Sequence, residues 1–420
     1  MNKRTASIFL LLAVMMLGIA GPTGVRKAGA QGTFFGAQRF PAIEVDGDDN
    51  LYLMMSVATA PASERRPHSQ IFFTMSQDFG ATWDNLPLTR NLSKSPGEAF
   101  GPSLAVSKSG KLRLHVSYHD NSNGTTQAYI ISTKKKTKFR KPLNLTPHNG
   151  GAFAPRVALD SSGTVNVVWG DTKDGTAKVL FARSTDLGLT FNEPLNVSGS
   201  GGTGFDPEIA IDSRDAINVV WQDTAPGPAV IMFSRSTDGG ASFSEPKRIS
   251  TGSGSATEAA IATDSADRIS VVWADESEGT SQAFYARSTD AGSTFSEPID
   301  VSSFSDGDIH KPTVVTFQNN VYVAFQNGDL FGADTIDNRQ VFLVKSFDAG
   351  VSFGDSEQVS NANNNKGRAH SPALTVDSRG MIHMVWIDAS FVGNDEGVLL
   401  YSNSSDGRRF SVQRLILAVL

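Results

Sequence analysis

Nine ionisable side chains lie around a position that recurs along the chain, a proline in six units and Ala259 in the fifth, and their types suit a ligand with acidic or hydroxyl groups. Guanidinium and ammonium groups hold carboxylates and sulfates by charge-assisted hydrogen bonds, and carboxylates accept bonds from hydroxyls. The proline motif repeats while its charged neighbours differ, as a ligand site requires. The alternative is that these side chains are solvated or paired with each other. The candidates are Arg39, Arg156, Asp206, Glu208, Glu258, His310, Lys311, Arg368 and His370.

A second set of carboxylates recurs two residues after a tryptophan, as in Trp169-Gly170-Asp171. A ring of such aspartates could hold a cation, but we interpret each as bracing the loop that follows it. We therefore predict no metal site and no cofactor. The absence of cysteine excludes thiol catalysis and Cys-ligated zinc or iron–sulfur centres. The members are Asp171, Asp223, Asp275 and Asp388, and Asp120 joins them from Tyr118-His119-Asp120, although the ungapped register favours Tyr118.

A third set of carboxylates belongs to the pattern S-x-D-x-G-x-x-(F/W), which we call the box. Its Asp is expected to accept bonds from turn N–H groups, its Gly to adopt a positive φ, and its aromatic to fold back on its own unit. One copy has Lys134 and Lys136 instead of Asp and Gly. We interpret the basic run Lys134 to Lys141 as a solvated turn rather than an anion site. The aspartates with this structural role are Asp78, Asp186, Asp238, Asp290, Asp348 and Asp406.

These landmarks belong to a unit that recurs seven times, with successive boxes 52 to 58 residues apart. Each unit contains four short segments rich in β-branched and aromatic residues, punctuated by Gly, Asn, Asp and Ser. Repeated four-stranded units predict an all-β fold, a seven-bladed β-propeller, with a six-bladed ring and one stray unit as the alternative. Each box is expected between the third and fourth strands, on the face opposite the Trp-x-Asp loops. The blades are expected to start near residues 39, 100, 153, 205, 257, 310 and 370.

The first 30 residues have the layout of a secretory signal peptide, with a basic start, an apolar run and Ala28-Gly29-Ala30 at the cleavage position. An uncleaved anchor is the alternative. Cleavage would remove four cations and no acid, taking the net charge from −6 to −10. Such a charge argues against nucleic acid or an anionic membrane as the main partner. We expect residues 31–420 to form one propeller domain, secreted or periplasmic, with no membrane insertion.

The boxes and their spacing resemble the Asp-box (bacterial neuraminidase repeat) propellers of the sialidase superfamily, over nearly all of residues 31–420. In the enzymes of that family three arginines surround the substrate carboxylate, beside a Tyr nucleophile with a Glu partner and an Asp acid. Arg39-Phe40-Pro41 is similar to the Arg-Ile-Pro segment that supplies the first arginine. Among the tyrosines, only Tyr118 is expected to reach the mouth of the ring.

The favoured function is an exported carbohydrate-binding module whose ligand is an acidic glycan. The alternatives are a glycoside hydrolase of exo-α-sialidase type and a cell-surface scaffold that binds a protein partner. The longest loops belong to blades 6, 7 and 1, so we expect the ligand there. The cations Arg39, His310, Lys311, Arg368 and His370 gather at those blades, with Asp206, Glu208 and Glu258 expected across the ring.

Overall fold

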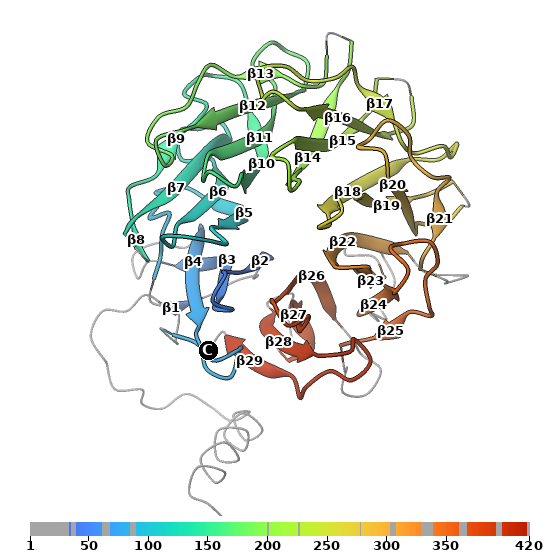
Figure 1. Ribbon diagram of the computed structural model, residues 1–420. Coiled ribbons are helices and arrows are strands. Elements are labelled where there is room, and N and C mark those ends of the chain that lie inside the picture. The colour runs from blue at the N-terminus through green and yellow to red at the C-terminus, as the bar shows by residue number, and fades with distance from the viewer. Residues whose placement is uncertain are drawn as a thin grey trace, which may run out of the picture.

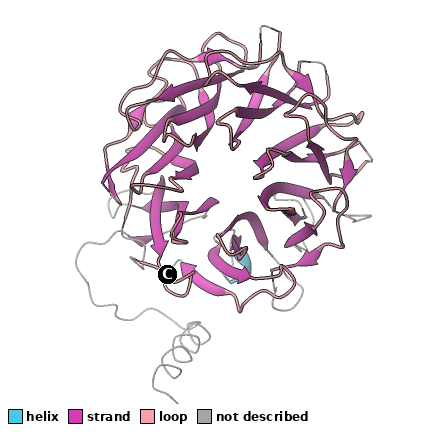
Figure 2. Cartoon of the chain, in the orientation of Figure 1, coloured by secondary structure: helices cyan, strands magenta, loops and turns pink. Residues whose placement is uncertain are grey.

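Seven antiparallel sheets stand around a central channel in the computed structural model (Figures 1 and 2). The seven-bladed β-propeller is thereby confirmed and the six-bladed ring excluded. Among the described residues no helix is long and apolar enough to cross a membrane. The proposed signal peptide lies outside them. The structure describes residues 33–34, 39–60, 68–84, 90–135, 137–199, 201–225, 227–277, 279–302, 308–328, 339–360, 368–391 and 397–417.

The innermost strand of each blade, strand A, lies beside the channel in Figure 1, and strand B follows it outward. Both are rich in Val, Ile and small residues, which suits strands buried on two faces. The A strands are β2 (Arg39–Val45), β5 (Ala99–Val106), β10 (Ala152–Leu159), β14 (Gly204–Ile211), β18 (Ala256–Thr263), β22 (Ile309–Phe317) and β26 (Ala369–Val376). The B strands are β3 (Leu51–Ala60), β6 (Leu114–Asp120), β11 (Val165–Asp171), β15 (Ile217–Asp223), β19 (Ile269–Asp275), β23 (Asn320–Asn327) and β27 (Ile382–Asp388).

The two outer strands, C and D, carry the box turn between them. The C strands are β4 (His68–Ser76), β7 (Gln127–Lys135), β12 (Lys178–Ser184), β16 (Val230–Ser236), β20 (Gln282–Ser288), β24 (Gln340–Ser346) and β28 (Val398–Ser404). The D strands are β9 (Leu143–Asn144), β13 (Leu195–Asn196), β17 (Lys247–Arg248), β21 (Ile299–Asp300), β25 (Glu357–Gln358) and β29 (Arg414–Leu417). In blade 1 a single bridge, Phe72 to Asn91, takes the place of strand D. The remaining elements are β1 (Thr33–Phe34), β8 (Lys138–Phe139) and the 3-10 turn η2 (Ala389–Phe391).

The strand register decides which loops share a face. In blade 4, Gly204 at the start of strand A pairs with Asp223 at the end of strand B. Strand B begins at Ile217, which pairs with Ser236, the first residue of the box. The starts of the A strands and the B–C loops therefore share one face, whose channel opening we call the strand-A mouth. The A–B turns and boxes share the other, the box face, as the sequence predicts.

The hydrophobic core lies between the blades. Seven clusters of buried apolar side chains each join two neighbouring blades, and together they run around the whole ring. The cluster between blades 3 and 4, for example, packs Phe181 against Val219. Each sheet thus buries both faces against its neighbours, so no blade is a complete domain alone. The largest side chains in this core are Trp169, Trp221, Trp273 and Trp386.

The ring closes between blades 7 and 1 through side chains. Strand β1 pairs with the end of β3 inside blade 1, Thr33 opposite Ala60, and so adds nothing to blade 7. The Tyr401 hydroxyl of blade 7 instead donates to the carbonyl of Phe79 in blade 1 at 3.0 Å. On the same face, the amide of Ser378 donates to a carboxylate oxygen of Asp49 at 2.8 Å. The sequence left open how the ring closes, and these contacts answer it.

The box turns brace themselves and dock on the preceding blade. In blade 4 the Asp238 carboxylate accepts bonds from the Ser236 hydroxyl at 2.7 Å and the Ser242 amide at 3.0 Å. The closing aromatic, Phe243, packs against Phe181 of blade 3, with ring centroids 5.1 Å apart. Phe243 therefore packs on its own blade and on blade 3 at once, within the cluster between them. The reason is Gly240, whose missing Cβ leaves room for the Phe181 ring to pack under the turn.

Acid should destabilise the fold through the box aspartates. The Thr294 hydroxyl and amide and the Ser288 hydroxyl lower the pKa of Asp290 from 3.8 to about 2, and the other five box aspartates shift in the same direction. A carboxyl group whose pKa is lower in the folded chain than in the unfolded chain stabilises the fold at a pH above its unfolded-state pKa. This contribution is lost as the pH falls through its folded-state pKa. We expect urea midpoints to fall from about pH 4 towards pH 2. Equal midpoints at pH 6 and pH 2.5 would contradict this.

Candidate functional site

A β-bulge interrupts every strand A at the strand-A mouth. In blade 4 the ladder shifts between Phe205 and Glu208, and Asp206 at the bulge has a φ of 43°. This left-handed backbone costs a residue with a Cβ about 1–2 kcal/mol, and such strain clusters at functional sites. The bulge residues line a cavity of about 400 Å³ on the channel axis. They are Gly101, Ala154, Asp206, Glu258, Lys311 and Ser371, with φ between 43° and 62°.

Blades 3 and 4 contribute an ion pair to this mouth. The guanidinium of Arg156 contacts the carboxylate of Glu208, and the two side chains are 27% and 28% exposed. Burial acts to lower the pKa of Arg156, but Glu208 outweighs it and raises that pKa. Burial also raises the pKa of Glu208, and nearby Asp206 adds to this while Arg156 opposes it. Asp206 itself is exposed at the bulge, where its carboxylate faces solvent.

Blades 5 and 6 contribute a second cluster, centred on Glu258. Its carboxylate contacts the ammonium of Lys311, accepts the Lys311 amide at 2.7 Å, and lies 3.6 Å from Nδ1 of His310. Burial alone would raise the pKa of Glu258, but His310 and Lys311 lower it to about 2. The bond to Glu258 in turn raises the pKa of His310.

This contact overturns one expectation. Glu258 was expected across the ring from His310 and Lys311, but it binds both of them. Equivalent positions of adjacent blades are neighbours around a narrow axis, so the bulge residue of blade 5 meets that of blade 6. The interpretation that these side chains pair with each other holds for Arg156 with Glu208 and for Lys311 with Glu258.

Blades 6 and 7 bring two arginines together. Arg339 precedes β24 and Arg368 precedes β26, and their backbones form a parallel bridge. Arg339 is only 4% exposed, and nothing in the repeat pattern pointed to it. His370 follows Arg368 in β26, is 8% exposed, and its Nδ1 lies 3.1 Å from the Ser371 hydroxyl.

The long loops beside this arginine pair fall outside the described residues. They are residues 61–67, 329–338, 361–367 and 392–396. Arg39 pairs with Ser56 across β2 and β3, and its side chain also lies outside the described part. The expectation that the ligand binds beside blades 6, 7 and 1 therefore stays a prediction.

His119 also lines the strand-A mouth and was not among the candidates. Its ring packs edge-on against Phe100, with centroids 3.8 Å apart. Burial, with the charge of Arg156, lowers its pKa to about 3, so the ring is neutral. Gly101 permits this arrangement, because a Cβ there would lie 2.9 Å from the imidazole. The signal in the sequence is its place in Tyr118-His119-Asp120, where the other blades have Ser, Gly, Gln, Ala or Ile.

The Trp-x-Asp aspartates brace their own loops. In blade 5 Asp275 accepts the Ser277 amide at 2.9 Å and the Trp273 indole N–H at 2.9 Å. Asp120 pairs with Ala99 just as Asp171 pairs with Ala152, so Asp120 and not Tyr118 is the blade 2 member. Within the described ranges no group of three or more His, Asp or Glu side chains is arranged to hold a metal ion.

All six tyrosines of the chain lie away from the strand-A mouth. Tyr118, expected to reach it, is 1% exposed and stacks on Tyr129 with ring centroids 5.7 Å apart. That expectation is wrong because strand B places Tyr118 in the core between blades 1 and 2. The others occupy the same kind of position: Tyr52, Tyr129, Tyr285, Tyr322 and Tyr401 belong to or pack on the inter-blade clusters.

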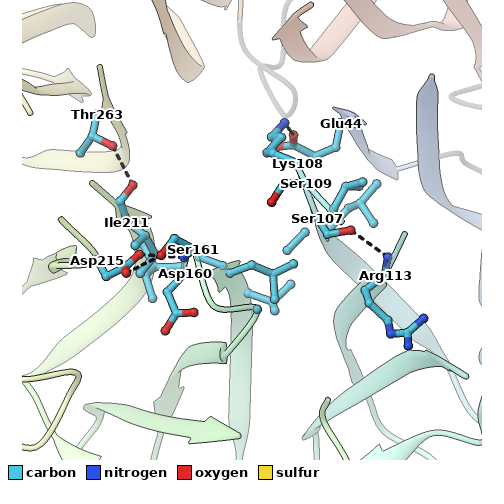
Figure 3. A pocket seen from close by; sticks show the side chains of 18 of the residues that line it. Glu44, Ser107, Lys108, Ser109, Arg113, Asp160, Ser161, Ile211, Asp215 and Thr263 are labelled. Atoms are coloured by element: carbon cyan, nitrogen blue, oxygen red, sulfur yellow. Dashed lines mark hydrogen bonds and ion pairs between the residues drawn. The ribbon is translucent and has the colours of Figure 1, made fainter. Parts of the chain in front are cut away.

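The box-face end of the channel is wider, and several of its polar groups join neighbouring blades. This cavity of about 950 Å³ is lined by A–B turns (Figure 3). Lys108 pairs with Glu44 of blade 1 at 3.1 Å. The Ser161 amide donates to Asp215 of blade 4 at 2.7 Å. Because these bonds join neighbouring blades, we take the strand-A mouth as the candidate site.

Comparison with known proteins identifies the fold. No family model matches the chain, and no curated protein matches it in sequence. Among solved structures, an ulvan lyase of polysaccharide lyase family PL25 has a TM-score of 0.60 at 12% identity, covering 91% of this chain and 97% of its own. The Hadza microbial sialidase Hz136 has a TM-score of 0.51 at 15% identity, covering 81% and 75%. A protein of unknown function from Dyadobacter fermentans has 0.51 at 12%, covering 71% and 93%. The chain therefore shares its propeller fold with sialidases and polysaccharide lyases.

Proposed function

We propose that this protein is an exported glycan-binding propeller that holds an acidic glycan at the strand-A mouth. The observation that carries the proposal is the ring of bulges. Five of the six described bulges hold a residue with a Cβ in a left-handed backbone, and their side chains differ from blade to blade. A scaffold that keeps this strained geometry while varying the side chain presents a set of different groups to one ligand.

The chemistry at the mouth suits a sugar with an acidic substituent. Arg368, which is half-buried and held by a backbone bridge to the buried Arg339, is placed beside the mouth to supply a guanidinium group, which binds carboxylate and sulfate in bidentate fashion. The exposed carboxylate of Asp206 accepts bonds from sugar hydroxyls. The pairs Arg156–Glu208 and Lys311–Glu258 hold their side chains in fixed positions, which reduces the entropy lost on binding.

The structural neighbours support a glycan as the ligand class. One ulvan lyase of this fold is bound to a saccharide of glucuronic acid and sulfated rhamnose, with a TM-score of 0.58 at 12% identity, covering 86% of this chain and 92% of its own. The sialidase Hz136 shares the fold as well. Binding rather than sialidase catalysis is favoured because no tyrosine of this chain reaches the mouth, whereas the family reaction uses a Tyr nucleophile.

A binding experiment tests the proposal. In calorimetry with 3′-sialyllactose, a glucuronate oligosaccharide and lactose, we expect an acidic sugar to bind and lactose to bind more weakly. Arg39→Ala with Arg368→Ala should weaken acidic-sugar binding at least about tenfold, because charge-assisted bonds contribute about 1.5–3 kcal/mol. Arg214→Ala, an exposed arginine on the box face, is the matched control. Unchanged binding in the double variant, or no binding of any acidic sugar, would refute the proposal.

Glycoside hydrolysis is the second candidate, favoured by the carboxylates of blade 4. Glu208 has a raised pKa, as a general acid needs, and Asp206 adjoins it in the same cavity. Turnover of a fluorogenic sialoside or uronide that Glu208→Gln abolishes, with unchanged binding, would establish this reading. No turnover of either substrate would leave binding as the function.

A further inference from the structure

Blade 2 carries a concentration of positive charge that the rest of the chain lacks. Residues 100–150 contain seven lysines and two arginines against a single acid, Asp120, whereas the whole chain has a net charge of −6. Most of these cations lie at the box-face end of the blade. We call them the blade 2 basic surface: Lys111, Arg113, Lys134, Lys135, Lys138, Arg140 and Lys141.

The fold gives this surface a defined shape. Where other blades have a box turn, strand β7 continues and turns back as β8, with Lys135 opposite Lys138. Arg90 of blade 1 supports this hairpin by donating to the Thr137 carbonyl at 2.6 Å, with its guanidinium 5.7 Å from the Phe139 ring. Lys134, Lys135 and Lys138 thus stand on a two-stranded hairpin held by the neighbouring blade.

The cations of the turn and of the hairpin form one surface. His115 pairs with Ser132, and the same register continued by two residues sets Arg113 beside Lys134. The amide of Arg140 donates to the Ser132 carbonyl at 2.9 Å. Burial together with the charges of Arg113 and Arg140 lowers the pKa of buried His115 to about 4, which places both arginines near it.

Nothing in the described part of the chain neutralises the lysines of this surface. Lys111, Lys134, Lys135, Lys138 and Lys141 are exposed, and none of them forms an ion pair or side-chain hydrogen bond there. The buried Nε of Arg140 has no acceptor either. Like charges held together repel each other, so the cluster destabilises the folded chain unless an anion offsets it. The loss of the box Asp and Gly in this blade removes a turn brace as well.

The sequence favoured a solvated turn at Lys134 to Lys141, but the hairpin and its unpaired lysines change that interpretation. We propose that the blade 2 basic surface binds a linear polyanionic polysaccharide, rich in sulfate or uronate groups, at a site separate from the strand-A mouth. A flexible chain can follow one blade without meeting the acidic remainder of the ring. A flat anionic membrane would also contact the acidic blades, which would repel it. A membrane surface also favours exposed large apolar side chains, and those among the described residues all lie outside blade 2. Proteins that bind single-stranded nucleic acid stack its bases on exposed aromatic rings. The aromatic ring of this hairpin, Phe139, is covered by the guanidinium of Arg90 instead.

The test uses the full chain and dextran sulfate, with neutral dextran as the blank. We expect salt-sensitive binding to dextran sulfate only, and Lys134→Ser with Lys135→Ser and Lys138→Ser should weaken it at least about tenfold at low salt. The matched control is Lys173→Ser with Arg408→Ser and Arg409→Ser, which removes the same charge from exposed positions elsewhere and should change binding less than about twofold.

Three outcomes would overturn the proposal. They are no binding of dextran sulfate by the native chain, an equal loss in the control, and tighter binding to phosphatidylserine vesicles or to a single-stranded oligonucleotide. Melting temperatures report folding, and the variant with Lys134→Ser, Lys135→Ser and Lys138→Ser should melt at no lower temperature than the native chain. Binding of 3′-sialyllactose should be the same in this variant, so a failure here is distinguishable from a failure of the strand-A mouth.

Discussion

We expect Tyr401→Ala to lower the free energy of unfolding by about 3–5 kcal/mol, the range for truncating a buried aromatic. Tyr401 is fully buried in blade 7, and Trp83 of blade 1 packs edge-on against its ring at 5.4 Å. Its hydroxyl lies 2.7 Å from Nδ1 of His383 and donates to the Phe79 carbonyl. The substitution removes the Trp83 and Phe79 contacts from the interface that closes the ring, and the His383 contact within blade 7. Denaturant unfolding followed by tryptophan fluorescence measures the loss.

The matched control for Tyr401→Ala is Phe233→Ala. Phe233 occupies the same position in blade 4, is 2% exposed, and packs against Phe295 of blade 5 at 5.1 Å. Because the closing interface is built like the internal ones, the two losses should agree within about 1 kcal/mol. If Tyr401→Ala were nearly neutral while Phe233→Ala destabilised the fold, closure would depend on something other than these side chains.

We expect Gly240→Ala to lower the free energy of unfolding by about 2–4 kcal/mol, the sum of left-handed strain and overpacking. Gly240 has a φ of 83°, and a Cβ at this position would lie 2.3 Å from Cε1 of Phe181. The ring cannot retreat, because it is buried between blades 3 and 4. The same unfolding measurement reports the change.

A second glycine separates strain from crowding. Gly163 has a φ of 82° in an A–B turn, and a Cβ there meets no atom within 4 Å. Gly163→Ala should therefore show the strain alone, about 1 kcal/mol. Equal losses of unfolding free energy in the two variants would mean that Gly240 is needed only for the conformation of its own turn, and not for the contact of that turn with the preceding blade.

The two faces of the propeller have different tasks. On the box face, turns dock on neighbouring blades: in blade 3, Arg183 donates to the Gly239 carbonyl, and Ser161 to Asp215. On the other face the bulges expose Asp206 and hold Glu258 and Lys311 toward the channel. Blade 2 departs from this division because its box is a basic hairpin, which is why we assign it a ligand of its own.

The sequence by itself determined the seven units, their strands and the chemistry of their turns. These features are local. The box Asp binds groups within four residues, as Asp238 does with Ser242, and the loop Asp binds groups two residues away, as Asp275 does with Ser277. Short-range bonds of this kind depend only on the residues of one segment, so a repeated pattern predicts them in every copy.

Only the tertiary structure decided which blade supplies each partner. Lys311 contacts Glu258, Phe243 contacts Phe181, and Arg368 contacts Arg339. In each pair, more than one strand separates the two residues along the chain. These contacts depend on how close neighbouring blades come at a given radius, and that distance is set by the packing of all seven sheets into one closed ring. No segment contains that information alone, which is why the sequence identified the charged residues around the mouth but assigned Glu258 to its wrong side.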